Sequence, residues 1–127
     1  MELHNIDIYG SDNIFAVPML EKEFSNAVNE AWKNKPPWKR YQKKLMEDLS
    51  VLSVELEGAI RLPQYEKLTG EKYLYSIRHP KTKKNVRVLY TIVDGDIILL
   101  HAFLEKNDSD YRRGINLSNK RLDELEE

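Results

Sequence analysis

The chain has 127 residues, of which 32% are charged and 41% hydrophobic, and its formal net charge is −1. This length and composition fit one folded domain over residues 1–127 and exclude wholesale disorder. Cysteine is absent, which excludes disulfides and thiolate metal sites. No apolar run approaches the roughly 20 residues of a membrane helix, and the first ten residues lack a secretory signal pattern. We therefore expect a cytoplasmic protein that makes no contact with a membrane.

The N-terminal half predicts two short strands and a helical hairpin. Alternation over 3–9 favours a strand, and 14–17 can pair back on it across a turn cluster. Apolar residues then recur at helical spacing over 20–32 and again over 38–56. Pro36 and Pro37 separate the two helices.

In the C-terminal half the period changes to two. Residues 59–72 read as connecting chain, and a strand, a basic loop and a β-branched strand follow, at 73–79, 80–85 and 86–93. Asp94-Gly95 is a two-residue hairpin signal before an apolar strand at 96–103. Asn107 to Asp110 offer caps for a last helix, whose apolar face begins at Tyr111.

This order predicts an α+β fold. We expect a small antiparallel sheet with a central three-stranded meander, packed against the N-terminal helical hairpin and the C-terminal helix.

Charge is unevenly spread along the chain. Residues 1–60 hold seven Lys/Arg against ten Asp/Glu, and residues 61–127 hold thirteen against eleven. The segment 72–88 has six basic residues and no acid: Lys72, Arg78, Lys81, Lys83, Lys84 and Arg87. Such a cluster can attract phosphates, although a solvated strand–loop surface is the more common reason for it.

Conventional catalytic motifs are absent, and the three histidines, His4, His79 and His101, lie far apart in the sequence. We therefore expect neither a metal site nor a cofactor. Arg78 ends one predicted strand and Arg87 opens the next, so the two can face each other across an antiparallel pair. Guanidinium groups held by a sheet suit a phosphate clamp, but they are equally compatible with surface ion pairs of about 0–1 kcal/mol.

Three strand segments carry a resemblance that covers nearly half the chain. They are Leu74-Tyr75-Ser76-Ile77-Arg78, Val86-Arg87-Val88-Leu89-Tyr90 and Ile98-Leu99-Leu100-His101-Ala102-Phe103-Leu104-Glu105-Lys106. In this order, before a C-terminal helix, they resemble the RelE/HigB-like toxins of type II toxin–antitoxin systems, and most of all the phage-derived HigB-like branch. The resemblance implies a RelE-like fold.

The resemblance also implies an activity. Family members commonly cleave mRNA on translating ribosomes without a metal, which inhibits translation and arrests growth. It implies catalytic roles for Arg78, Arg87, Lys106 and Tyr111, and His79 or His101 could act as general acid or base. Of these two we select His79, because His101 lies in an apolar run that favours a structural role. Lys72, Lys81, Lys83 and Lys84 would bind RNA.

The implied partners are the ribosome, mRNA and a cognate antitoxin, often a helix-turn-helix protein. Two alternatives stay open. One is a non-enzymatic, ParE-like inhibitor of DNA gyrase, and the other is a phage or mobile-element interaction module without toxicity. The sequence does not give the oligomeric state.

Overall fold

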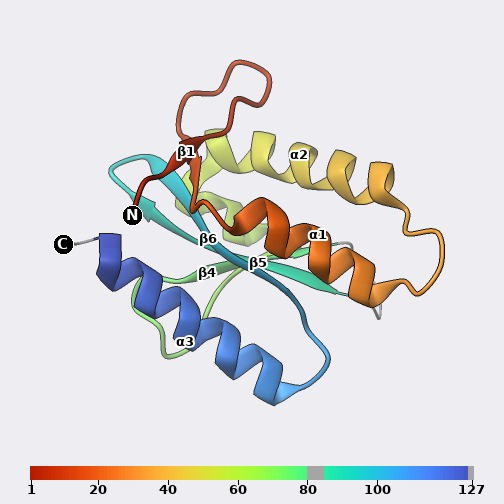
Figure 1. The fold of residues 1–127 in the computed structure, drawn as a ribbon. Coiled ribbons are helices and arrows are strands. Elements are labelled where there is room, and N and C mark those ends of the chain that lie inside the picture. Colours follow the sequence, from red (N-terminus) through yellow and green to blue (C-terminus); the bar gives the residue numbers. More distant parts are fainter. Residues whose placement is uncertain (80–84, 126–127) are drawn as a thin grey trace.

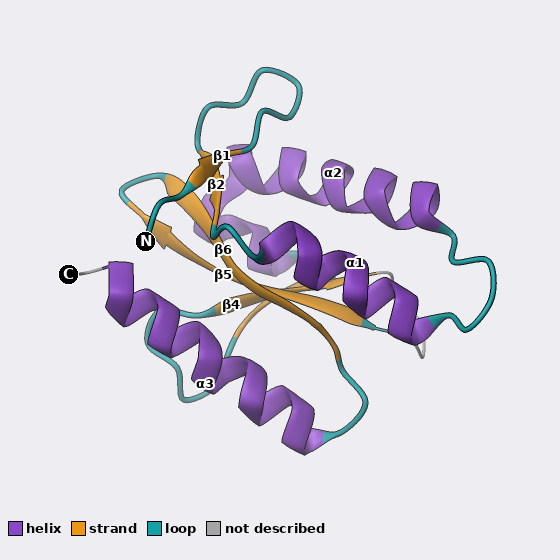
Figure 2. Cartoon of the chain, in the orientation of Figure 1, coloured by secondary structure: helices purple, strands orange, loops and turns teal. Residues whose placement is uncertain are grey.

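The computed structural model describes residues 1–79 and 85–125, apart from the side chain of His79. Three α-helices and six strands make up the described chain (Figures 1 and 2). In chain order they are β1 (His4–Asn5), β2 (Ile14–Ala16), α1 (Leu20–Ala31), α2 (Trp38–Glu55), a 3₁₀ helix (Leu56–Arg61), β3 (Tyr65–Lys67), β4 (Tyr75–His79), β5 (Val86–Val93), β6 (Asp96–Leu104) and α3 (Asp108–Leu125). The α+β class is confirmed.

The sheet is larger than expected and mixed. Its strand order is β1-β2-β6-β5-β4-β3, and β2 runs parallel to β6 while every other neighbouring pair is antiparallel. The prediction of a small antiparallel sheet is therefore wrong in size and in direction. Residues 59–72 are likewise not plain connecting chain, because they contain the end of the 3₁₀ helix and the whole of β3, which pairs with β4.

The meander β4-β5-β6 forms the centre of this sheet. Asp94 and Gly95 have φ angles of 50° and 82°, as the tight turn between β5 and β6 requires. The register is regular from Val86↔Leu104 to Leu89↔His101 and then shifts between Leu89 and Tyr90. An extra residue, Leu100, is thereby accommodated in β6, which bends the strand locally.

Helices cover both faces of the sheet. Figures 1 and 2 show α1 and α2 on one side and α3 on the other, with β6 and β5 between them. Because side chains alternate along a strand, Val88 and Tyr90 are buried on the hairpin side, whereas Arg87 and Leu89 face α3. No described helix has the length and hydropathy needed to cross a membrane.

Candidate functional site

Two arginines face each other where β4 ends and β5 begins. Arg78 and Arg87 are register partners, and the Arg78 N–H donates outward to Gln64 O at 2.9 Å. The pair is therefore of the non-hydrogen-bonded kind, in which side chains on one face lie closest together. The predicted juxtaposition of Arg78 and Arg87 is confirmed.

The guanidinium of Arg87 is surrounded by protein groups. Nη1 donates to Glu66 Oε1 at 2.6 Å and to Ser76 Oγ at 3.0 Å. On the other side Nε and Nη2 donate to the two carboxylate oxygens of Glu105 at 3.2 and 3.3 Å. Only 7% of Arg87 is exposed. Two acidic groups from neighbouring segments thus neutralise this arginine.

Charge and burial act in opposite directions on Arg87. Burial lowers its pKa, but hydrogen bonds and charge from Glu105 and then Glu66 raise the pKa above the ordinary value. The guanidinium therefore stays charged while its charge is locally balanced.

Tyr111, in the first turns of α3, closes this cluster. Arg87 Cζ lies 5.0 Å from the centre of the Tyr111 ring, a cation–π contact. The Tyr111 hydroxyl donates to Glu66 Oε1 at 3.4 Å. Burial and the charge of Glu66 raise the pKa of Tyr111 to about 12. At neutral pH the phenol therefore remains protonated and can donate a hydrogen bond but cannot serve as a base.

Lys106 turns away from Arg87. Its Nζ lies 2.7 Å from Glu30 on α1, whose hydrogen bond and charge raise the pKa of Lys106. Its backbone N–H donates to Asp110 Oδ2, while Asn107 Oδ1 accepts from the Asp110 N–H at 2.9 Å and caps α3. The ammonium thus lies over the opening between α1 and α3.

Of the remaining predicted residues, Lys72 is described and lies outside this cluster. Lys72 precedes β4, at the end of that strand far from Arg78, and its Nζ lies 5.2 Å from the Tyr73 ring centre. The residue before it, Glu71, accepts a hydrogen bond from Asn119 in the later turns of α3. Lys81, Lys83 and Lys84 lie outside the described residues. For His79 only the backbone is described, as the partner of Val86.

The two carboxylates that contact Arg87, those of Glu66 and Glu105, were not predicted from the sequence. Glu66 could not be found because β3 is short and has no recognisable alternation, so nothing placed Glu66 beside Ser76 in the sheet. Glu105 follows β6 directly and could have been found from its position one residue before Lys106.

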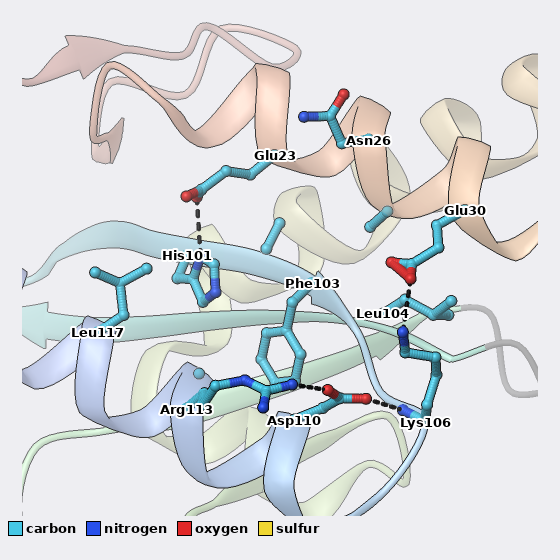
Figure 3. Close-up of a pocket in the computed structure, with 13 residues that line it drawn as sticks. Glu23, Asn26, Glu30, His101, Phe103, Leu104, Lys106, Asp110, Arg113 and Leu117 are labelled. Atoms are coloured by element: carbon cyan, nitrogen blue, oxygen red, sulfur yellow. Dashed lines mark hydrogen bonds and ion pairs between the residues drawn. The ribbon is translucent and has the colours of Figure 1, made fainter.

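A second site lies between α1 and α3, beside the C-terminal half of β6 (Figure 3). It is a pocket of about 440 Å³. Its lining is polar at both ends and apolar between them: Glu23, Asn26, Ala27, Glu30, His101, Ala102, Phe103, Leu104, Lys106, Asp110, Arg113, Gly114 and Leu117.

His101 lies in the wall of this pocket and is 13% exposed at its side chain. Its Nδ1 lies 3.0 Å from Glu23 Oε1, although the ring N–H direction lacks the alignment of a hydrogen bond. Its ring stacks on Phe103 with centroids 5.3 Å apart. The apolar run around His101 therefore did not predict its polar contact, which comes from α1.

Glu23 is fixed by Arg121 of α3. Arg121 Nη1 and Nη2 donate to the two oxygens of Glu23 at 2.8 and 2.7 Å, and Nη1 also donates to Leu100 O at 2.7 Å. Burial raises the pKa of Glu23, but His101 and Arg121 together lower it to about 2. Glu23 is consequently an anion throughout the physiological pH range.

Among the residues that the structure describes, no three His, Asp or Glu side chains gather as ligands for a metal ion. Comparison with protein families, with curated proteins and with solved structures yields no match for this chain.

Proposed function

We propose that this chain is the toxin component of a type II toxin–antitoxin pair and acts as a ribosome-dependent, metal-independent mRNA endoribonuclease. The order of its elements supports this function. A helical hairpin precedes the meander β4-β5-β6, which carries the three resembling segments, and α3 follows. This is the order that the resemblance to RelE/HigB-like toxins implies.

One observation carries the proposal. Arg87 contacts Tyr111 of α3 and is the register partner of Arg78, so three predicted catalytic residues from three elements lie together. Two cations and a hydrogen-bond donor on one rigid surface can stabilise the charge that develops on a phosphate during attack. His79, the fourth residue proposed for this site, follows Arg78 in β4.

The carboxylates around Arg87 define how RNA would bind. Glu66 is 50% exposed and Glu105 is 24% exposed, so both can swing toward water. A phosphate would replace Glu66 on Nη1, and Arg78 would make the first contact. The lysines proposed to bind RNA, Lys72, Lys81, Lys83 and Lys84, would act through long-range attraction.

The proposed partners are the ribosome with its mRNA and an antitoxin, of the helix-turn-helix type, that covers the basic face. The proposed location is the cytoplasm, where translating ribosomes are found in bacteria.

The test is primer extension on a defined mRNA in a bacterial translation extract, with the wild type beside Arg78→Ala and Tyr111→Phe. We expect cuts that require ribosomes, that disappear when the nucleotide at the cut carries 2′-deoxyribose, and that weaken at least about tenfold in both variants. Lys22→Ala on α1 is the matched surface control. Intact mRNA with the wild-type protein would contradict the proposal.

A second candidate is favoured by the neutralised state of Arg87. A non-enzymatic, ParE-like inhibitor of DNA gyrase, which needs no free phosphate clamp and no proton transfer, accommodates a buried Arg87–Glu105 pair without rearrangement. Supercoiling inhibited by the wild type and by Tyr111→Phe alike, together with intact mRNA, would favour it. High expression without growth loss would favour an interaction module without toxicity.

A further inference from the structure

Another pocket lies between α1 and α2, on the hairpin side of the sheet. Its volume is about 520 Å³, within the roughly 300–1,000 Å³ range of small-molecule sites. Residues of α1, of α2 and of the segment 4–8 form its walls, and Leu99 of β6 lies at its base. Leu99 is the register partner of Tyr90, so this pocket and Arg87 are on opposite faces of the sheet.

The pocket exists because the two helices of the hairpin pack on different parts of the fold. Helix α1 packs mainly on β6 and β5, whereas α2 packs mainly on the 3₁₀ helix and β4. Figure 1 shows the two helices running in opposite directions after the turn that joins them. The rest of the fold therefore holds them in place more than they hold each other, and space remains between their facing side chains.

The inner part of this pocket is apolar. Leu20 and Phe24 are four residues apart on α1 and therefore point to the same side of the helix. Both are buried, as are Leu49 of α2 and Leu99. At the mouth, Met46 of α2 is 41% exposed, and its unbranched side chain can adapt to the shape of a ligand. The apolar part of a ligand would leave water on entering here.

The charged side chains at this pocket are acidic. Of the described residues that line it, Asp7 and Glu21 are carboxylates and none is Lys or Arg. Asp7 Oδ1 accepts the Gly10 N–H at 3.0 Å. Across residues 1–79 and 85–125, however, neither carboxylate forms an ion pair. The rim of the pocket consequently carries negative charge without a counter-charge from the protein.

The pocket between α1 and α3 differs in this respect. Its three carboxylates, those of Glu23, Glu30 and Asp110, each pair with a basic side chain. Its negative charge is thus balanced within the protein. Between α1 and α2 the balancing charge is absent from the described lining, and a ligand with a positive charge would be complementary to it.

We propose that the pocket between α1 and α2 binds a small organic amine with an apolar body. The body lies against Phe24 and Leu49, and the ammonium lies at the rim, where Asp7 and Glu21 attract it. An organic anion of the same shape is repelled by the same carboxylates. The inference does not rest on RNA cleavage, because the pocket lies across the sheet from Arg87.

The test is an amide NMR titration of the protein at pH 7 with three compounds that share a phenethyl body. They are phenethylamine, phenethyl alcohol and hydrocinnamate, whose head groups are positive, neutral and negative. We expect the amine to bind with a Kd of about 1 mM or tighter. It should bind at least about threefold more tightly than the alcohol, and the anion more weakly than the alcohol. This preference should shrink in about 1 M salt, and the shifted amides should belong to residues 4–8, α1 and α2.

Two kinds of variant test the charge. Met46→Arg places a cation at the mouth, at a position exposed enough to accept it, and should make the anion bind more tightly than the amine. Val51→Arg is the matched control, because it makes the same change at an exposed residue of α2 outside the pocket. Asp7→Asn combined with Glu21→Gln should make the amine and the alcohol bind equally. Thermal unfolding shows which variants are folded.

Each outcome supports or overturns the inference. It is overturned if the wild type binds none of the three compounds, if it binds all three equally, or if the preference for the amine survives in the folded double variant. If the double variant is unfolded, an unchanged preference in Met46→Arg overturns it. A dimer in sedimentation velocity that Met46→Arg dissociates and Val51→Arg does not would assign the pocket to a second copy of this chain instead. None of these results depends on mRNA cleavage, so this inference and the proposed function can fail separately.

Discussion

Arg87 and Glu66 lie two strands apart in the sheet, yet they form an ion pair of 2.6 Å across the intervening β4. Glu105 completes the neutralisation from the other side, so the positive charge of Arg87 is balanced before any ligand arrives. This pair connects the edge strand β3, the central strand β5 and, through Tyr111, helix α3. Its loss should therefore affect stability as well as any activity.

We predict that Arg87→Ala lowers the free energy of unfolding by about 2–3 kcal/mol, because two carboxylates are left without a counter-charge beside a cavity. Arg78→Ala is the matched control. It removes the like charge opposite Arg87 and should change the free energy of unfolding by less than about 1 kcal/mol. Urea denaturation measures both. An equal decrease in the free energy of unfolding in the two variants would contradict a stabilising role for the ion pairs of Arg87 with the two carboxylates.

The close approach of α3 to β6 depends on Gly114. A methyl group at this position would lie 2.5 Å from Phe103 Cε1 and 2.7 Å from Cζ. Alanine gains about 1 kcal/mol of helix propensity, but we expect Gly114→Ala to destabilise the protein by about 1–3 kcal/mol through overlap. Gly114→Ala with Phe103→Leu should recover most of that loss in thermal unfolding. A single variant that is more stable than the wild type would refute the tight contact.

We predict that the contribution of Glu23 to the stability of the fold is lost in acid. Its folded pKa of about 2 lies below the ordinary value of 4.5, so its ion pairs stabilise the fold fully above pH 4.5. That contribution is lost as the pH falls from about 4.5 toward 2. We expect Glu23→Gln to cost about 1–2 kcal/mol at neutral pH, allowing for solvent screening, and the gap to close in acid. Glu21→Gln, on the exposed side of α1, is the control, and denaturation at several pH values provides the measurement.

Asn107 should matter for α3 as a cap. Because its Oδ1 accepts the Asp110 N–H, Asn107→Ala should lower the free energy of unfolding by about 1 kcal/mol, and Asn107→Asp should retain most of the stability. Chemical denaturation of the two variants checks this. Equal stability of Asn107→Ala and the wild type would mean that water satisfies this helix end equally well.

Local patterns predicted the central part of this fold. Residues 86–93 form β5 as expected, because β-branched residues and the Asp94-Gly95 turn act within a few positions. The spacing of apolar residues that predicts α1 and α2 likewise depends only on residues close together in the sequence. The partner strand of β2 could not be predicted from local patterns. Ile14 pairs with Ile97, and neither segment has a sequence feature that identifies the other as its partner.

The candidate site shows the same division. The facing of Arg78 and Arg87 was predicted because one short loop joins their strands. The contacts that determine their chemistry come from distant segments: Glu66 to Arg87, Glu23 to His101 and Glu30 to Lys106. In each contact the acidic residue comes from a segment outside the meander. Tertiary packing brings that segment into place, and the spacing of residues along the sequence does not predict such packing.

The parallel pairing of β2 with β6 has a consequence for biogenesis. Ile14, Phe15 and Ala16 pair with Ile97, Ile98 and Leu99, some 80 positions later in the chain, and the Ile97 N–H donates to Asn13 O. During synthesis β2 can pair with β1, but its parallel partner β6 is missing until that strand has left the ribosome. The helical hairpin can form meanwhile, but the sheet is completed only once β6 is available. This protein should consequently fold slowly for its size, because its sheet needs a pairing between segments far apart in the sequence.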